Sequence, residues 1–262
     1  MIVMIVRIFC PIYVTIEEED LKKALKSYIR RLISNLEITR LDIISIRGRY
    51  ISIDIEGGDA EIAKNYLTKV MGTRLSLDDI TAGYEYSGKV QAISPNDILV
   101  DVGIEPPKYV SIPLQDMVAS LFRVKKRLRE AHMLMRWIGI RKNFPIVVRI
   151  EHIEKNEQTK IFGRLGRRTL TMLKKWLQDR LDRVIVYGIL RAQLDKKIRR
   201  AKLHKRIIKI ERIGFLEHAI VCRYGEFADD VERELRRQGI HSTSIFMPRR
   251  LRKILRSLIE KA

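Results

Sequence analysis

Apolar and polar positions along residues 1–80 predict strands and helices in turn. An apolar run opens the chain, acidic residues after Thr15 predict a capped helix start, and apolar side chains then recur every three to four residues. Two alternating stretches joined at Arg47-Gly48-Arg49 predict a tight hairpin, and a second helix ends at Gly72. The elements expected are a strand, a helix, a two-stranded hairpin and a helix, over residues 1–9, 15–33, 41–55 and 60–71. This order predicts a small α+β module.

Shorter alternating runs follow in residues 81–166, separated by Ser-Pro-Asn and Pro-Pro turns. Five strands in this order predict a small closed barrel of the OB type. The connection over residues 115–144 is longer than such a barrel needs and has helical spacing, so we predict a helical insertion in which Trp137 is a core residue. The strands are expected at residues 83–93, 97–104, 108–114, 145–155 and 160–167.

Helical and strand patterns alternate from residue 167 to residue 262, which predicts an open α/β domain. The second of its helices carries a basic polar face, and the chain ends in a basic helix after Pro248. The helices are expected at 170–181, 190–203, 227–238 and after 248, and the strands at 183–189, 207–212, 218–223 and 242–246. The whole chain is therefore predicted to be an α+β protein in three parts, 1–80, 81–166 and 167–262.

Charge is concentrated in the last of these parts. The chain has a formal net charge of +20, and residues 167–262 hold 26 lysines and arginines against 11 aspartates and glutamates, whereas residues 1–80 hold 12 of each. A surface of this charge attracts nucleic acid or an anionic membrane and accelerates encounter with it. A solvated basic surface that binds nothing is the alternative. A hydrophobic content of 46% is sufficient for real cores, so this is not a basic tail.

Other features of the sequence indicate where the protein functions and whether it binds a metal or a cofactor. The first apolar run is interrupted by Arg7, followed by Pro11 and too short to cross a bilayer, so we expect a soluble, cytoplasmic protein without a membrane partner. Cys10 and Cys222 lie in apolar runs and are interpreted as two buried thiols, with a disulfide between them left open. Cysteine and histidine lack metal-ligand spacing, and no cofactor is expected. Five asparagines and six glutamines beside 84 charged residues are typical of a thermophile.

The predicted barrel resembles the S-one RNA-binding domain. The resemblance lies in Gly88-Lys89-Val90 of the first strand, Val100-Asp101-Val102-Gly103 of the second, and the two late strands. The chain departs from that family where bases are usually stacked, because Asn96, Leu99 and Ser111 replace the expected aromatic and histidine residues. Tyr109 and Phe162 remain as candidate stacking residues, and Lys160 lies at the position where the family often has a basic residue that faces a phosphate.

Basic clusters elsewhere are the stronger candidates for contacts with phosphates. One cluster lies in the predicted barrel insertion, one on the second helix of the C-terminal domain and one at the start of the terminal helix. Their members are Lys125, Lys126 and Arg127; Lys196, Lys197, Arg199, Arg200 and Lys202; and Arg249, Arg250, Arg252 and Lys253.

Acidic residues offer a weaker hypothesis of metal-dependent phosphodiester cleavage. The tightest set contains Asp179, Asp182, Glu211, Glu217 and His218, and two carboxylates near a histidine are a plausible divalent site. Neighbouring arginines favour paired or solvated charges instead, and His218 is interpreted as a structural residue at a strand start. The glycine-punctuated run 163–168 lacks the Gly-Lys-Ser/Thr ending of a P-loop. We therefore expect no enzymatic activity.

The segments at residues 176–200 and 211–226 resemble an archaeal family catalogued as domain of unknown function 2110. That resemblance extends to the order of parts along nearly the full chain, implies an archaeal origin, and brings no established activity. The residues then favour a protein that grips structured RNA, ribosomal or related to RNA processing, through phosphate contacts. The alternatives are an accessory or scaffold subunit of such a complex or of the ribosome, and a metal-dependent nuclease.

Overall fold

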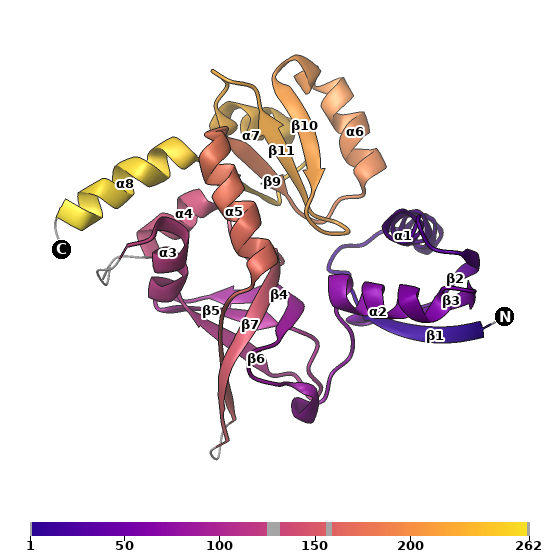
Figure 1. Ribbon diagram of the computed structural model, residues 1–262. Helices are drawn as coiled ribbons and strands as arrows, with labels where there is room; N and C mark the ends of the chain where they lie inside the picture. The colour runs from indigo at the N-terminus through magenta and orange to yellow at the C-terminus, as the bar shows by residue number, and fades with distance from the viewer. Residues whose placement is uncertain (1, 125–131, 156–158, 261–262) are drawn as a thin grey trace.

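Three sheets follow one another along the chain (Figure 1). The computed structural model describes residues 2–124, 132–155 and 159–260. A three-stranded sheet comes first, a closed five-stranded barrel second, and a four-stranded sheet third. Helices accompany each of them, which confirms the predicted α+β class and the predicted barrel. None of the described helices has the length and apolar character needed to cross a bilayer.

The N-terminal module is an antiparallel sheet of order β1-β3-β2 whose one face is covered by two helices. The tight turn between β2 and β3 contains Gly48 with a positive φ of 57°, as the hairpin pattern predicted. The first helix begins at Glu18, and its N-cap residue Glu17 makes no side-chain cap, so the expected cap at Thr15 is wrong. The elements are β1 (Ile2–Phe9), α1 (Glu18–Leu32), β2 (Ile38–Arg47), β3 (Tyr50–Gly57) and α2 (Ala60–Met71).

The barrel closes in the order β4-β5-β6-β8-β7, with β6 and β8 running parallel. Gly88 has a steric reason in this closure, because a Cβ there would lie 2.4 Å from the carbonyl oxygen of Asp101 on the next strand. The connection between β6 and β7 contains two helices, as expected for 115–144, and the residues between them lie outside the described part. The elements are β4 (Glu85–Ile93), β5 (Asp97–Asp101), β6 (Tyr109–Pro113), α3 (Leu114–Phe122), α4 (His132–Ile138), β7 (Pro145–Glu154) and β8 (Lys160–Leu165).

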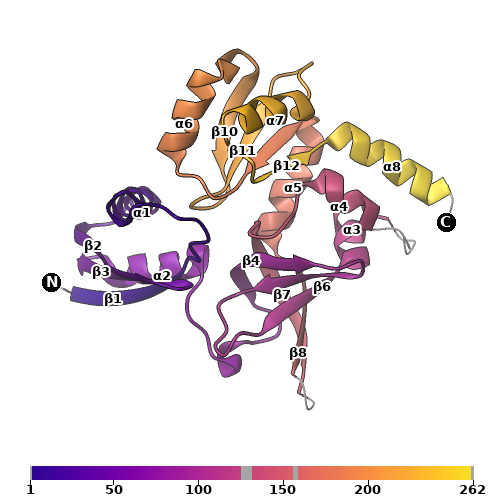
Figure 2. The same ribbon diagram turned by 180° about the vertical axis from the view of Figure 1, so that it is seen from behind.

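The C-terminal sheet has the order β10-β11-β9-β12 and is antiparallel throughout. Helices α6 and α7 pack on one of its faces, and Figure 2 shows α4, α5 and α8 grouped on the other side. The elements are α5 (Arg167–Asp179), β9 (Arg183–Val186), α6 (Arg191–Arg200), β10 (Ile207–Arg212), β11 (His218–Cys222), α7 (Ala228–Arg237), β12 (Thr243–Phe246) and α8 (Pro248–Glu260).

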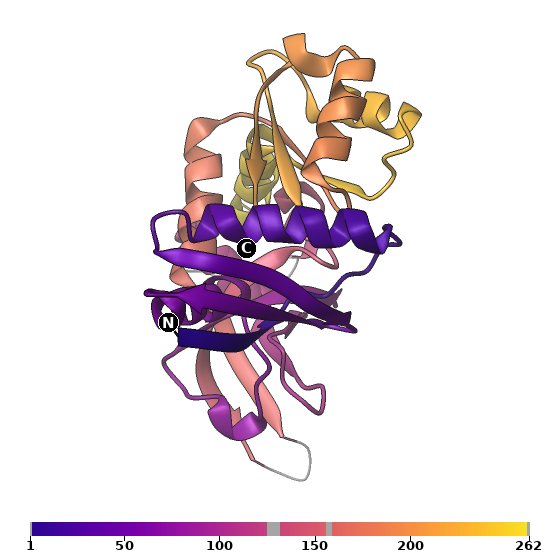
Figure 3. The same ribbon diagram turned by 90° about the vertical axis from the view of Figure 1, so that its right-hand side faces the viewer.

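The three parts share their hydrophobic cores. The barrel core continues through Trp176 of α5 into Ile185 and Phe246 of the C-terminal sheet. The core of the N-terminal module includes Phe215 and Leu216 from the turn before β11. Helix α1 accordingly lies between the three-stranded sheet and the C-terminal domain (Figure 3).

Three residues singled out by the sequence lie in or beside these cores. Cys10 and Cys222 are both buried free thiols, and burial raises the pKa of each to about 12. Trp137 is half-buried and packs against the barrel core and against the core beneath α6 and α7, with two arginines over its ring.

Candidate nucleic-acid interface

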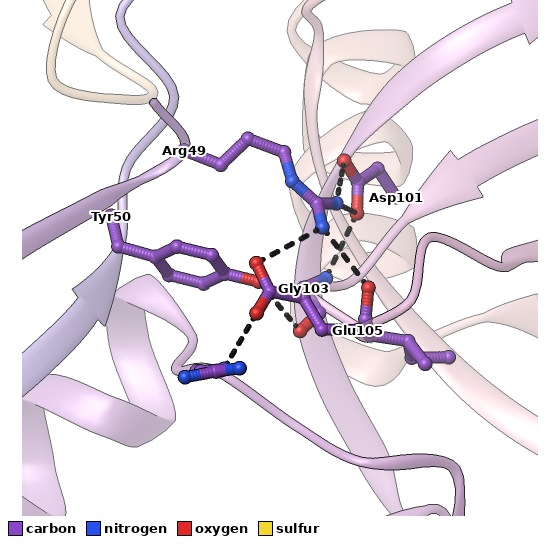
Figure 4. A network of polar contacts seen from close by, with 7 residues as sticks. Arg49, Tyr50, Asp101, Gly103 and Glu105 are labelled. Carbon is purple, nitrogen blue, oxygen red and sulfur yellow. Dashed lines mark hydrogen bonds and ion pairs between the residues drawn. The ribbon is translucent and has the colours of Figure 1, made fainter. Parts of the chain in front are cut away.

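A network of charged side chains joins the N-terminal module to the barrel (Figure 4). Nη1 of Arg49, after the β2–β3 turn, lies 2.7 Å from each carboxylate oxygen of Asp101 on β5. Its Nη2 donates to the carbonyl oxygen of Ile104 at 3.0 Å, and the Tyr50 hydroxyl donates to that of Gly103 at 3.0 Å. Charge-assisted hydrogen bonds of this kind are strong and directional. These charges therefore act inside the fold and are withdrawn from any ligand.

A second buried network joins all three parts around Glu217. The Glu217 side chain is fully buried, and its Oε1 accepts from Lys89 Nζ of β4 at 2.7 Å and from the Tyr13 hydroxyl of the N-terminal module. The same hydroxyl accepts from the backbone N–H of Gly188 at 3.1 Å. Burial, followed by the charge of Glu217, raises the pKa of Tyr13, so the phenol stays a donor. Glu217 thus connects the three parts through its bonds to Lys89 and Tyr13.

The other acidic residues of the nuclease hypothesis are also engaged. Asp179 accepts from Arg183 at 2.8 Å, and Glu211 accepts from the Trp176 indole at 3.0 Å and pairs with Lys209 at 2.9 Å. Asp182 directly precedes β9, and its carboxylate accepts a long hydrogen bond of 3.4 Å from the backbone N–H of Ala228, the first residue of α7. Within residues 2–124, 132–155 and 159–260, no three His, Cys, Asp or Glu side chains form a group that could hold a metal ion.

The outer face of the barrel carries a cross-strand row of the residues compared with the S-one domain. Pairing aligns Leu99 of β5 with Ser111 of β6, Ser111 with Phe162 of β8, and Phe162 with His152 of β7. The Phe162 and His152 rings are stacked, with centroids 4.6 Å apart and an interplanar angle of 15°. The Ser111 hydroxyl donates to Asp97 at 2.8 Å. The row thus offers one aromatic pair that is already stacked on itself.

Tyr109 and Lys160 lie on the same face, two residues before Ser111 on β6 and Phe162 on β8, and these two strands are adjacent. Tyr109 is 36% exposed, and Lys160 is exposed opposite Glu154 of β7. This side of the β7–β8 pair carries charges of both signs, since Glu154 lies opposite Lys160 and Glu151 pairs with Arg164 at 3.4 Å. The predicted barrel residues are therefore brought together on one face of mixed charge.

Helix α6 presents most of its predicted basic residues to solvent. Lys196, Arg199, Arg200 and, just beyond the helix end, Lys202 are exposed, and no carboxylate of the described residues pairs with them. Lys197 differs, because its ammonium group donates to the carbonyl oxygen of Gln238 after α7. Four of the five residues are thus available to a ligand, and the fifth fastens two helices together.

A groove of about 1180 Å³, open to solvent, runs between α1 and α6. Lys23, Arg31 and Asp20 contribute to it from α1. Helix α6 contributes Lys196, together with Arg191 and Asp195, which pair with each other at 3.0 Å. Arg212 also lines it, and burial lowers the pKa of this guanidinium. The basic residues of α1 were not singled out from the sequence because the N-terminal module is neutral as a whole; the spacing of Lys23 and Arg31, on one helical face, was the available signal.

Helix α8 and the barrel insertion complete the predicted set. Arg249, Arg250 and Lys253 are exposed at the start of α8, and Arg250 pairs with Asp229 at 3.1 Å. Arg252 is half-buried and donates to the carbonyl oxygen of Leu177 at 2.9 Å, so it fastens α8 to α5. The α6 and α8 clusters lie on opposite faces of the C-terminal sheet (Figure 2). Lys125, Lys126 and Arg127 lie outside the described residues.

Residues 181–229 match the family model described as DUF2110 C-terminal domain. The match runs from the residues before β9 to the start of α7 and confirms the family resemblance predicted from the sequence, within this part of the chain. No curated protein matches the chain.

Solved structures give low-scoring similarities. A crystal structure of an a/eIF2alpha-aDim2p-rRNA complex from Pyrococcus horikoshii OT3 is 12% identical, with 48% of this chain and 62% of that chain covered and a TM-score of 0.26. The intact alpha subunit of aIF2 from Pyrococcus abyssi is 9% identical, with coverage of 64% and 97% and a TM-score of 0.25. A protein described as a putative exosome complex RNA-binding protein is 13% identical, with coverage of 69% and 95% and a TM-score of 0.21. This chain thus spans 62% of the first of these, and scores of this size carry no conclusion about function.

Proposed function

We propose that this protein binds structured RNA, ribosomal or related to RNA processing, chiefly through contacts between basic side chains and phosphates. One observation carries the proposal: four exposed basic side chains lie in the second half of α6 and just beyond its end, and no carboxylate of the described residues pairs with them. The α1–α6 groove next to them adds Lys23 and Arg31. A row of unpaired positive charges is the footprint of a polyanion site.

The α6 cluster gives the sharpest test. Replacing Lys196, Arg199, Arg200 and Lys202 by glutamine removes four positive charges and leaves Lys197 in its structural bond. Each phosphate contact contributes about 0.7 to 0.9 to the slope of log affinity against log salt concentration, so we expect the slope to fall by about 3. Binding of a folded RNA, titrated by fluorescence anisotropy at several salt concentrations, measures it.

A control variant separates this local effect from total charge. Four residues of the N-terminal module that do not line the α1–α6 groove are replaced by glutamine to make the same change in net charge: Arg7, Arg47, Lys64 and Lys69. The control variant should keep most of the wild-type slope of log affinity against log salt concentration. Equal affinity and equal slope in the wild type and the α6 variant would contradict the proposal.

An accessory-subunit role is the second candidate, and the N-terminal module favours it. The edge strand β1 pairs on one side only and turns Val3 and Ile5 to solvent, 62% and 68% exposed. Ile62 and Tyr66 of α2 are exposed as well. Exposed apolar residues on a module of zero net charge suit a protein partner. If RNA binds only when a partner is added, and binding is then lost in a Val3→Lys/Ile5→Lys variant, this role replaces direct binding.

We also propose that the protein does not catalyse a reaction. The support is the engagement of the acidic residues in ion pairs and hydrogen bonds, as at Asp179 and Glu211. Labelled RNA incubated with Mg²⁺ or Mn²⁺ should stay intact. Divalent-dependent cleavage that disappears in Glu211→Gln, with RNA binding retained, would overturn this.

A further inference from the structure

A pocket of about 500 Å³, open to solvent, lies where the loop between β11 and α7 meets the end of α5 and the start of α8. Its lining unites arginines from three separate segments with two aromatic residues of the loop. We name it the arginine–aromatic pocket and define it by Arg180, Arg223, Tyr224, Phe227, Arg249 and Arg250. The β11–α7 loop belongs to the segment that matches the family model.

The two aromatic side chains are left unburied by the fold. Tyr224 is 77% exposed and Phe227 is 54% exposed, on either side of Gly225, whose positive φ of 88° makes the turn between them. The guanidinium of Arg249 lies over the Tyr224 ring, 5.2 Å from its centroid. An exposed ring beside an arginine is the arrangement on which nucleic-acid bases stack.

The charges of the pocket are uneven. Within the described part of the chain, Arg180, Arg223 and Arg249 have no carboxylate within ion-pair distance, while Arg250 pairs with Asp229. The carboxylate of Glu226 also lines the pocket but is held by Arg206, with Nη2 and Oε2 2.5 Å apart. Asp182 remains as the other carboxylate of the lining. The arginines therefore exceed the free carboxylates and suit an anionic ligand.

We propose that the arginine–aromatic pocket binds one unpaired nucleotide of the RNA, with the base stacked on Tyr224 or Phe227 and its phosphate held by Arg223 and Arg249. This rests on the proposed function and adds to it a preference for RNA with an unpaired loop. A membrane surface is less suited, because the two rings stand among arginines instead of within an apolar face. The barrel face, by contrast, has its aromatic pair stacked on itself.

The test compares two RNA probes of equal stem length, one a hairpin with an unpaired loop and the other a fully paired duplex. Tyr224→Leu/Phe227→Leu should weaken binding of the hairpin by about 5- to 150-fold, the range for one stacked base. Duplex binding and the salt slope should stay as in the wild type. Both residues are exposed, so the fold should survive, and circular dichroism checks it.

Tyr84→Leu is the matched control, because Tyr84 is 66% exposed and lies before β4, outside this pocket. It should bind both probes like the wild type, and Tyr224→Phe/Phe227→Tyr should keep hairpin binding. Unchanged hairpin binding in the leucine variant overturns the inference, and so does an equal loss for both probes. In either case a salt slope still dependent on α6 would leave the proposed function standing.

Discussion

The barrel and the C-terminal domain use their charged side chains in opposite ways. Asp101 and Lys89 of the barrel are buried or nearly so and are bound to Arg49 of the N-terminal module and Glu217 of the C-terminal domain. On α6, Arg199 and Arg200 face solvent without an acidic partner among the described residues. These two barrel charges join the parts of the molecule, whereas these two α6 charges remain available to a ligand.

This difference shows that a residue can occupy a known binding position of a fold without being suited to bind there. A barrel of this kind binds oligonucleotides on its outer face in other proteins, through strands and loops that here carry Leu99, Ser111 and the Phe162–His152 stack. We infer that the barrel is a scaffold that joins the modules and that the main RNA contacts lie on the C-terminal domain.

The largest effect is expected at Glu217. Glu217→Gln leaves Lys89, whose side chain is 12% exposed, without its counter-charge. Breaking one side of a buried ion pair costs about 3 to 5 kcal/mol, so the free energy of unfolding should fall by that order. Chemical denaturation followed by circular dichroism measures it.

Its control is the double variant Lys89→Met/Glu217→Gln, in which the buried charge is removed along with its partner. We expect this variant to recover much of the lost stability. A loss below about 1 kcal/mol in the single variant, or no recovery in the double variant, would show that the junction does not hold the parts together.

The pH dependence of His218 gives the second effect. Burial, and then the charge of Arg212, lowers the pKa of His218 from 6.5 to about 4, while Nε2 lies 3.1 Å from the carbonyl oxygen of Ile189. Below pH 6.5 the His218 imidazole is protonated in the unfolded chain but stays neutral in the folded chain down to about pH 4. The contribution of His218 to the free energy of unfolding is therefore fully present above pH 6.5. It is lost as the pH falls toward 4.

The wild type compared with His218→Gln isolates this contribution, since the amide of glutamine can still donate to Ile189. The difference between their free energies of unfolding should shift by about 3 kcal/mol against the wild type between pH 7 and pH 4. A difference that does not change with pH would mean that His218 titrates normally in the folded protein.

The third effect concerns the joint between the N-terminal module and the barrel. Asp101→Asn removes the charge that Arg49 holds with two bonds of 2.7 Å, and hydrogen bonds to charged groups contribute about 1.5 to 3 kcal/mol. We expect a loss of about 2 kcal/mol in the free energy of unfolding. Asp42→Asn is the control, because Asp42 makes similar bonds with Lys26 and Arg40 on an exposed face. Equal losses in the two variants would argue against a special role for the joint.

The order of elements could be predicted because it depends on local periodicity. The barrel strands and the helix over residues 60–71 follow from alternation, turn residues and Gly72 at a helix end. The start of α1 was missed because Thr15, a good capping residue, lies outside the helix and Glu17 takes the N-cap position without a side-chain bond. Several neighbouring polar residues can occupy the N-cap position. The path of the backbone decides which one does, and the hydrophobic periodicity does not reveal that path.

The candidate sites could be predicted only in part, because they depend on which distant residues meet. The basic character of α6 was readable, but the bond of Lys197 to Gln238 requires the packing of α6 on α7. The Phe162–His152 stack depends on the pairing register of β7 and β8, in which a bulge shifts the partners. Tyr224 and Phe227 were not singled out, because their exposure depends on the path of the loop between β11 and α7, which the residue pattern does not show.

The smallest effect is expected on the barrel face, and it tests the comparison most directly. Tyr109 is 36% exposed and lies beside Lys160 on the strand pair β6–β8. If the barrel is mainly a scaffold, Tyr109→Ala should weaken RNA binding by less than about 1 kcal/mol, which is about fivefold, whereas a strongly stacked base contributes about 1 to 3 kcal/mol. The measurement is the affinity for the hairpin probe, with the fold checked by circular dichroism. A larger loss, in a variant that keeps its stability, would place the principal contacts on the barrel and reduce the C-terminal domain to a source of electrostatic attraction.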